Sequence, residues 1–302
     1  MTKTIYPRTT EKPKLVFSGH ESFPCRYGWM PKLIEAVTTD SSVFKTDERA
    51  IVSLGLGKNM VRSIRFWGAV FGVIEFRDKE VVATEFGSRL LEPQHGIDPY
   101  LEETGSLWRL HWNVTTQANL GAWSTLFLDV KDVQITRENF IEAVLQKSEG
   151  SASMATATAH ADMLLKCYDA GRIPTTAFLE NALGCPLQEL GLLKTAISAG
   201  VPIVQISRGP KSGLDVPSFA YSVQDYWLRE APTSGQLSLR SLMFSRRGPG
   251  SVFRLDEASL HERLTALCES VPELSLSDDG AGGIDLVASK KTGPKLLEDL
   301  IW

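Results

Sequence analysis

The sequence is poor in the features that would place it outside the ordinary globular proteins. Its 302 residues include four cysteines, Cys25, Cys167, Cys185 and Cys268, and none forms a Cys-x-x-Cys pair, so neither a zinc ribbon nor a disulfide framework is supported. No apolar run approaches the roughly 18 residues that a membrane span needs, and residues 1–6 lack the apolar core of a signal peptide. We therefore expect a cytoplasmic protein of two or three domains with reduced cysteines.

Motifs for nucleotide binding are also missing. The pair Gly57-Lys58 would need a glycine five residues earlier and Ser or Thr after the lysine, but Val52 and Asn59 stand there. The glycine cluster within 280–283 follows a turn rather than opening a helix after a buried strand, so we interpret it as a loop. We predict no nucleotide cofactor.

Acidic and basic residues are unevenly distributed along the chain. The formal net charge is -4, from 32 Lys and Arg against 36 Asp and Glu. Residues 1–90 nevertheless carry 14 basic and 10 acidic residues, and residues 207–254 carry 7 and 3, which leaves the remainder acidic. A nucleic-acid site needs local clustering of cations rather than a basic protein, so DNA or RNA binding stays open. The alternative is that the uneven distribution of charged residues arises by chance.

The first 94 residues have the pattern of a basic arm followed by a winged helix-turn-helix domain. One helix is predicted from Gly28 onwards, and Thr46 is placed to cap a second. After the turn at Gly55-Leu56-Gly57, a third helix is predicted from Lys58 to about Phe71. A hairpin within 73–82 and a short helix at 86–91 complete the pattern, in which the third helix enters a major groove and the hairpin contacts phosphate.

That third helix has one apolar and one cationic face. Counting 100° per residue places Met60, Ile64, Trp67 and Phe71 on one side. The opposite side carries Lys58, Arg62 and Arg65, and no acidic residue occurs between positions 54 and 74 to pair with them. A solvated helix face is the ordinary explanation of such a charge run, but here we favour DNA contact. The remaining candidate DNA-binding residues of this domain are Arg26, Asn59, Arg77 and Lys79.

The rest of the chain is expected to be mainly helical with small β hairpins. In residues 95–184 we predict a helical bundle, whose first helix starts at Asp98 and Pro99 and whose others span about 119–129, 136–147 and 157–170. Residues 185–302 are expected to form an α+β domain that could be a second winged-helix-like unit. It would contain a strand at 203–206, helices near 237–244 and 256–269, and a final hairpin.

Two loops within residues 207–254, the second stretch with an excess of basic residues, also suit phosphate contact. Arg208 and Lys211 alternate with Gly209 and Gly213, and Arg246 and Arg247 precede Gly248. A mobile backbone with unpaired cations can follow a curved anionic strand. A bland exposed loop is an equally good interpretation of each.

The candidate catalytic residues are His20 and Glu21, which stand shortly before Arg26. An acid–base group and a metal ligand beside a cation are what a metal-assisted phosphodiester cut requires. A structural histidine is the commoner explanation. If the protein is catalytic, Mg or Mn is the expected cofactor.

Other acidic positions offer weaker signals for a metal site. Asp98 and Glu102 are one helical turn apart, although Asp98 is equally explained as a helix cap. Asp129 and Lys131 match the Asp-x-Lys fragment of many nucleases, which arises easily by chance. His111, between Leu110 and Trp112, is interpreted as a core residue, and the metal ligands stay unassigned.

Short motifs spread over nearly the whole chain together resemble one bacterial family. They are Gly19-His20-Glu21-Ser22-Phe23, Arg26-Tyr27-Gly28-Trp29, Ser53-Leu54-Gly55-Leu56-Gly57-Lys58-Asn59-Met60-Val61, Asp98-Pro99-Tyr100-Leu101, Leu110-His111-Trp112, Cys185-Pro186-Leu187, Arg208-Gly209-Pro210-Lys211 and Val252-Phe253-Arg254-Leu255-Asp256. The combination is similar to the SspB-type family, which is encoded in DNA phosphorothioation defence loci.

The resemblance implies a component of a system that replaces a non-bridging phosphate oxygen of DNA with sulfur. Members of the family are described as DNA-nicking proteins, and they act alongside a cysteine desulfurase, an ATPase and a sulfur-transfer protein similar to phosphoadenosine phosphosulfate reductases. We therefore expect a nickase that binds double-stranded DNA and opens one strand for sulfur insertion. The alternatives are a non-catalytic adaptor that targets the sulfur-transfer machinery and a transcriptional regulator.

Overall fold

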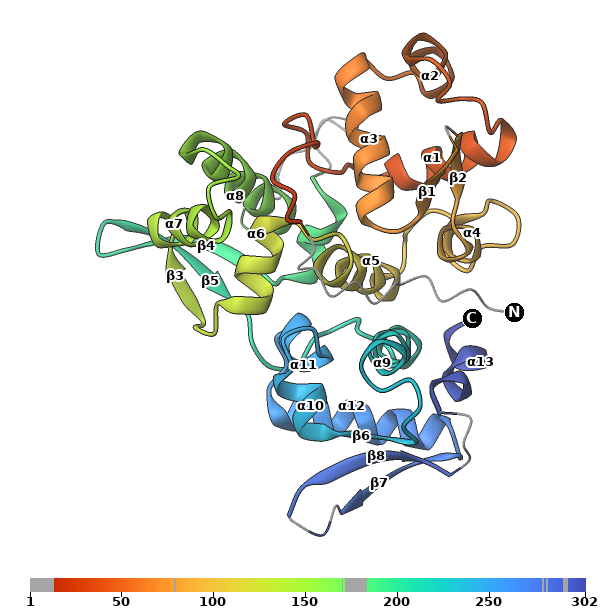
Figure 1. The fold of residues 1–302 in the computed structure, drawn as a ribbon, viewed down its shortest axis with the longest axis vertical. Coiled ribbons are helices and arrows are strands. Elements are labelled where there is room, and N and C mark those ends of the chain that lie inside the picture. Colours follow the sequence, from red (N-terminus) through yellow and green to blue (C-terminus); the bar gives the residue numbers. More distant parts are fainter. Residues whose placement is uncertain are drawn as a thin grey trace.

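The computed structural model describes residues 14–78, 80–169, 171, 184–278, 280, 282–289 and 293–302. This part of the chain is mainly helical and contains small antiparallel sheets, as expected from the sequence. Figure 1 shows the sheets at three separate corners of the molecule, with helix α5 (Thr104–Thr116) in the middle. None of the described helices has both the length and the apolar character needed to cross a bilayer.

The N-terminal elements follow the predicted order. Thr46 accepts a hydrogen bond from the Arg49 N–H and so caps the second helix, and Gly55 ends it with a left-handed φ of 61°. Thr84 caps the short fourth helix in the same way. The elements are α1 (Trp29–Thr39), α2 (Asp47–Leu54), α3 (Lys58–Val70), β1 (Ile74–Arg77), β2 (Glu80–Ala83) and α4 (Glu85–Leu91).

The middle region is not all helical, which corrects the expectation of a helical bundle at 95–184. A strand, β3, pairs antiparallel with β5, so a hydrogen-bonded ladder joins the middle region to residues beyond 185. β4, which the sequence did not predict, is the other neighbour of β5. The elements are α6 (Gly121–Trp123), the π-helix η1 (Ser124–Asp129), β3 (Gln134–Thr136), α7 (Arg137–Lys147), α8 (Met154–Tyr168), the short 3-10 helix η3 (Pro186–Leu190), β4 (Leu193–Ser198) and β5 (Val201–Ile206).

The C-terminal region confirms the expected mixture of helices and strands and adds a long helix, α9, that the sequence analysis missed. Its last two strands form the predicted hairpin. The elements are α9 (Val216–Glu230), β6 (Gln236–Ser238), α10 (Leu239–Phe244), α11 (Pro249–Val252), α12 (Glu257–Ser270), β7 (Leu274–Asp278), β8 (Ile284–Ala288), the 3-10 helix η4 (Gly293–Leu297) and α13 (Glu298–Ile301).

The middle and C-terminal sheets have the same topology. In each, a first strand is followed by helices and then by a hairpin, and the last strand of the hairpin lies in the centre of the sheet. The orders are β3-β5-β4 and β6-β8-β7. Among the described residues, α12 directly precedes its hairpin, as α3 precedes β1 and β2, whereas η3 lies between α8 and the hairpin β4–β5.

The helix expected to start at Asp98 starts at Thr104 instead. The Asp98 carboxylate accepts hydrogen bonds from the backbone N–H groups of Glu102 and Glu103, at 2.9 and 3.1 Å, and Leu101 has a left-handed φ of 56°. Asp98 therefore stabilises a tight turn before the helix rather than capping a helix that begins at Pro99. The assignment of Asp98 as a helix cap was therefore wrong.

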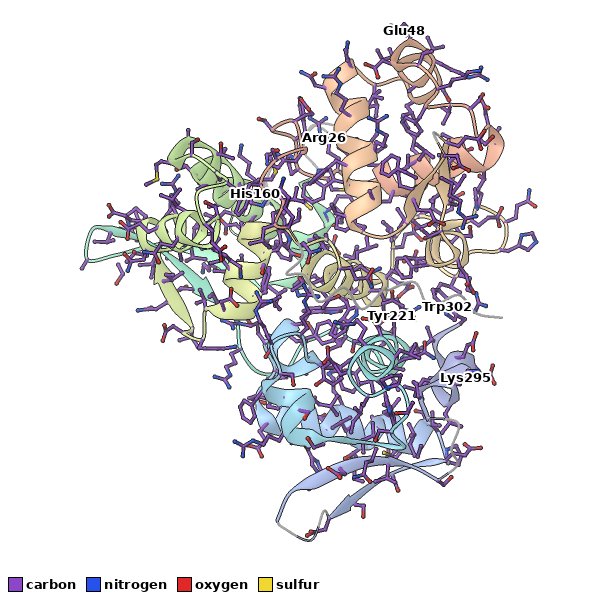
Figure 2. All side chains as sticks on the ribbon, in the orientation of Figure 1. Arg26, Glu48, His160, Tyr221, Lys295 and Trp302 are labelled. Carbon is purple, nitrogen blue, oxygen red and sulfur yellow. The ribbon has the colours of Figure 1, made fainter. Side chains whose placement is uncertain are left out.

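Helix α5 connects the three parts of the protein. All its residues after Thr104 are buried. Asn113 donates to the Phe71 carbonyl of the N-terminal part at 2.9 Å, and Trp112 donates to Asp225 of α9 at 2.7 Å. The N-terminal and C-terminal parts meet where the ring of Phe86 in α4 lies 5.3 Å from that of Tyr221 and 6.0 Å from that of Trp302, between centroids; Figure 2 labels the last two residues.

Candidate nucleic-acid interface

The interior face of α3 fixes the direction of its cationic face. Ile64 and Trp67 are fully buried, and the Trp67 indole N–H donates to the Phe23 carbonyl at 2.9 Å. Gly68 lies so close to Leu33 of α1 that a Cβ would come within 2.3 Å of that side chain. Because the helix cannot rotate against α1, the opposite face stays turned to solvent.

That outer face carries the predicted cations, but they are not without acidic neighbours. Asp47, in the first turn of α2, lies 3.5 Å from both Lys58 and Arg62. This corrects the sequence argument, which counted only acids within α3 and its flanks. The side chains of Lys58 and Arg62 are 57% and 42% exposed, and ion pairs in such settings contribute about 0–1 kcal/mol. A phosphate can therefore replace Asp47 at little loss.

Two further arginines of the N-terminal part lie over aromatic rings. The Arg65 guanidinium is 6.0 Å from the centre of the Phe44 ring. Arg26 is 5.9 Å from the Phe23 ring and 5.8 Å from the Trp29 ring. Such contacts hold a guanidinium in a defined place.

The remaining candidates of this part lie at the start of α3 and at the hairpin. Asn59 is exposed in the first turn of α3. Arg77 is exposed at the end of β1 and forms an ion pair with Glu75. Lys79 lies outside the described residues.

His20 and Glu21 differ sharply in environment. His20 is 7% exposed, and its buried Nε2 has no hydrogen-bond partner in the described structure. Its ring stacks on His160 of α8 at 5.7 Å and meets Phe66 of α3 edge-on at 6.1 Å. Burial lowers the pKa of His20, with a smaller contribution from Lys166, while Glu21 is exposed. The pair lies between α3 and α8, and its catalytic role stays a prediction.

His111 is a structural residue, as predicted. It is fully buried, its Nε2 lies 3.0 Å from the Val252 carbonyl and its Nδ1 lies 2.8 Å from the Tyr168 hydroxyl. Burial lowers its pKa to about 4, so the ring is neutral at pH 7. A neutral ring that donates to Val252 and accepts from Tyr168 satisfies both nitrogens.

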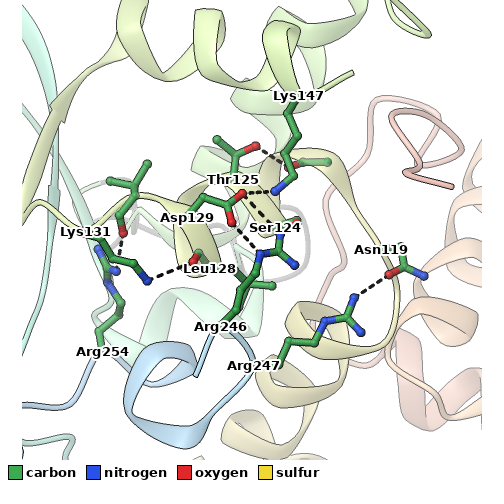
Figure 3. Close-up of polar contacts among 12 residues, drawn as sticks. Asn119, Ser124, Thr125, Leu128, Asp129, Lys131, Lys147, Arg246, Arg247 and Arg254 are labelled. Carbon is green, nitrogen blue, oxygen red and sulfur yellow. Dashed lines mark hydrogen bonds and ion pairs between the residues drawn. The ribbon is translucent and has the colours of Figure 1, made fainter. Parts of the chain in front are cut away.

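Asp129 is held by cations rather than placed beside another acid. It accepts hydrogen bonds from Arg246, at 2.7 Å, and from Lys147, and these contacts lower its pKa despite partial burial (Figure 3). Lys131 donates to the Leu128 carbonyl at the end of η1. The Asp-x-Lys fragment is therefore part of a basic cluster. Lys147 belongs to this cluster and was not predicted, because only the fold brings α7 to the end of η1.

The candidate cations within residues 207–254 differ in exposure and in hydrogen-bond partners. Arg247 donates to Asn119 at 2.9 Å, and Arg246 also donates to Ser124 at 2.8 Å. Arg208 is exposed. Lys211 is 3% exposed, and its ammonium donates to the Ser207 carbonyl and hydroxyl. Burial, with repulsion from Arg254, lowers the pKa of Lys211 to about 8.

A comparison with models of protein families shows the family to which this chain belongs. A family model described as "Protein of unknown function (DUF4007)" matches residues 17–301. The chain belongs to the DUF4007 family. No protein with a curated description matches it.

Two solved structures are similar to this DUF4007 chain. The magnesium ion-bound SspB crystal structure has a TM-score of 0.82 and 28% sequence identity, and the match covers 94% of this chain and 86% of that one. Another SspB crystal structure has a TM-score of 0.80 with the same identity and coverage. The SspB-type resemblance expected from the sequence motifs is confirmed.

The magnesium of that SspB structure has no evident counterpart among the residues described in this DUF4007 chain. Within the described ranges, no group of three or more His, Cys, Asp or Glu residues could hold a metal ion. Asp98 bonds to backbone N–H groups, and Asp129 is occupied by Arg246 and Lys147. Asp98 and Asp129 are therefore engaged in contacts within the protein.

Proposed function

We propose that this protein is the DNA-binding nickase component of a bacterial DNA phosphorothioation system. The observation that carries the proposal is the charge on α3. One face of this helix packs through Ile64 and Trp67, while Lys58, Arg62 and Arg65 occupy the opposite side. Cations gathered on one helix face provide the electrostatic part of DNA binding.

The order of elements around α3 supports docking in a major groove. Three helices followed by the hairpin β1–β2 are the order of a winged helix-turn-helix domain, in which α3 takes the place of the recognition helix. Arg77 lies on the hairpin, where such domains contact the DNA backbone. Side chains near the start of α3, including Asn59, would make the base-specific contacts with DNA.

The nicking part of the proposal rests on the likeness to SspB and to its family. A cut in one strand would give the sulfur-transfer protein, the ATPase and the cysteine desulfurase of such a system access to the DNA backbone. His20 and Glu21 are the proposed catalytic pair, because Glu21 is exposed and His20 contacts Phe66 of the DNA-docking helix. No step is assigned to a metal ion.

Conversion of supercoiled plasmid to open circle tests the proposal. The full-length protein is incubated with plasmid in Mg, Mn or EDTA, beside Arg62→Ala/Arg65→Ala, Glu21→Gln and, as a matched cation control remote from α3, Lys295→Ala (Figure 2). We expect nicking by the wild type and Lys295→Ala, loss of both binding and nicking in the double variant, and loss of nicking alone in Glu21→Gln. A wild type that leaves plasmid supercoiled under every condition would reject the nickase.

A non-catalytic adaptor is the second candidate. It is favoured by the fact that the described residues contain no cluster of metal-ligating side chains. An adaptor would bind duplex DNA through α3, leave plasmid supercoiled with every metal, and bind the sulfur-transfer protein or the ATPase in a pull-down of the purified components.

A further inference from the structure

A cavity of about 300 Å³ opens beside the end of η1, between the middle and C-terminal parts of the protein. Three cations line it: Lys131, Arg208 and Arg254. Its walls are otherwise largely apolar, and Phe244 of α10 lies at it with 62% of its surface exposed. The described residues that line this cavity include no Asp or Glu.

Arg254 is fixed in the wall of this cavity. Its guanidinium donates to the Val130 carbonyl at 2.7 Å and to the Asp132 carbonyl at 3.0 Å. The residue is 8% exposed and adopts a left-handed φ of 57°, which for a non-glycine residue raises the free energy by about 1–2 kcal/mol. Strained backbone of this kind is concentrated at functional sites.

The loop that carries Arg208 is anchored to the same wall. The Gly209 N–H donates to the Arg254 carbonyl at 3.0 Å, and Arg263 of α12 donates to the Lys211 carbonyl at 2.7 Å. With Lys211 turned inward, Arg208 is the exposed cation of this loop. The expected mobile loop is therefore a fixed one, and it holds Arg208 next to Arg254.

Two acids act on these cations, but neither lines the cavity. Asp132 and Asp256 act on Arg254 and Arg208 through space. The Asp256 carboxylate accepts from the Ser259 N–H at 2.8 Å and thereby caps α12. The cavity therefore keeps a net positive lining, which selects an anionic ligand.

We propose that this cavity binds one unpaired nucleotide of a DNA strand, with its base against Phe244 and its phosphate on Arg208 and Lys131. The inference rests on the proposed DNA-binding function and deepens it. An exposed aromatic ring beside cations is the combination that holds single strands, because bases stack on the ring while the cations follow the phosphates. A volume of about 300 Å³ is at the lower end for small-ligand sites and suits one nucleotide.

The base of a paired nucleotide cannot reach Phe244, since it is stacked inside the duplex. The cavity and α3 are therefore assigned different parts of the DNA. The helix α3 docks on duplex, and the cavity takes a nucleotide that has left it. This division makes the two sites separable by experiment.

Fluorescence anisotropy of the full-length protein with labelled oligothymidine and with a labelled duplex tests the assignment. Phe244→Leu keeps an apolar side chain but removes the ring, and Arg208→Ala removes the exposed cation. We expect each to weaken oligothymidine binding about tenfold, the equivalent of 1.4 kcal/mol, and to leave duplex binding unchanged. Phe244→Trp should restore oligothymidine binding, and Lys295→Ala should change neither affinity.

A second readout places the base directly. UV irradiation of oligothymidine that contains 5-iododeoxyuridine should cross-link it to residue 244, as mapped by mass spectrometry of the peptides. If Phe244→Leu and Arg208→Ala bind oligothymidine as tightly as the wild type, the cavity assignment is overturned while duplex binding by α3 stands. If the wild type binds neither oligothymidine nor duplex, the proposed DNA-binding function fails together with the cavity assignment.

Discussion

The N-terminal and C-terminal regions place a helix directly before a two-stranded hairpin, but the two helices have opposite charge. On α3, which precedes β1–β2, Lys58, Arg62 and Arg65 share the outer face. On α12, which precedes β7–β8, the exposed charges include three acids: Glu257, Glu262 and Glu269. A shared order of elements therefore does not make both regions suited to DNA, because the phosphate backbone repels an acidic helix.

The buried faces of the same two helices are alike. α3 buries Ile64 and Trp67, and α12 buries Leu264 and Leu267. Burial is required to form either unit, whereas charge is free to diverge on the outside. The corresponding helix of the middle region, α8, buries His160, an ionisable side chain, in its interior face.

The largest expected effect tests the likeness of the two interiors. Ile64 and Leu264 are each fully buried, so Ile64→Ala and Leu264→Ala should each lower the free energy of unfolding by about 2–5 kcal/mol, through lost burial and a cavity. Urea denaturation followed by circular dichroism measures this. Val52→Ala, at a site that is 83% exposed, is the control and should change stability by less than about 0.5 kcal/mol. An equally small change at Ile64 or Leu264 would contradict the packing described.

The second prediction concerns His160 of α8 and the loss of protein stability at acidic pH. Burial lowers the pKa of His160 to about 3, with a smaller contribution from His20, and both ring nitrogens of His160 lack a partner in the described structure. The unfolded chain binds a proton there below about pH 6.5, but the folded protein does so only near pH 3, so stability falls as the pH drops through this range. His160 should contribute a loss of about 2–3 kcal/mol between pH 7 and pH 4.5.

His160→Leu has nearly the same volume and should remove that contribution. Urea midpoints at the two pH values give the difference, and exposed His95→Leu is the matched control. The remaining acid sensitivity of the variant is expected to include His111, whose pKa is lowered to about 4. An acid-induced loss as large in His160→Leu as in the wild type would contradict the prediction.

The third prediction tests the charge difference itself. Arg62→Ala/Arg65→Ala should weaken duplex binding roughly 10- to 100-fold and flatten the plot of log K against log salt by about two units, because two phosphate contacts are lost. The matched change on α12, Glu262→Ala/Glu269→Ala, should alter neither quantity. Titrations at several salt concentrations measure both. Equal losses in the two double variants would refute the assignment of α3.

Much of the N-terminal region could be predicted because its signals are local. Thr46 and Gly55 mark the ends of α2, and the positions of Ile64 and Trp67 define the interior of α3. α9 was missed although Asp215 caps it and Pro217 lies in its first turn, since a strand-like stretch precedes it. Asp98 was wrongly assigned as a helix cap, because a carboxylate that accepts from nearby backbone N–H groups can stabilise either a turn or a helix start.

The candidate sites likewise contain parts that local sequence signals predict and parts that only the packing of the fold brings together. The cationic face of α3 follows from helical spacing alone, and it was predicted in full. Its neighbour Asp47 belongs to another helix, and Lys131, Arg208 and Arg254 are far apart in the sequence. Contacts of this kind are set by the packing of α2 on α3 and of η1 on the C-terminal part, and no spacing rule contains them.

The smallest expected effect concerns Asp47, the acid that moderates α3. Asp47→Asn removes the partner of Lys58 and Arg62, so duplex affinity should rise a few-fold, in line with exposed ion pairs worth about 0–1 kcal/mol. Glu48→Gln removes the same charge one residue later, at an exposed position of α2 (Figure 2). Its effect should be smaller, since it acts only through long-range repulsion of DNA.

Both substitutions weaken the favourable interaction of an acid with the N-terminus of α2, so each should lower stability by about 0.3–1 kcal/mol. Affinity is therefore measured at a temperature where both variants are folded. A rise in Asp47→Asn that exceeds the rise in Glu48→Gln, and that vanishes when Arg62 is also replaced by Ala, would show that α3 cations leave Asp47 for phosphate. Equal rises would mean that Asp47 acts only as a nearby negative charge.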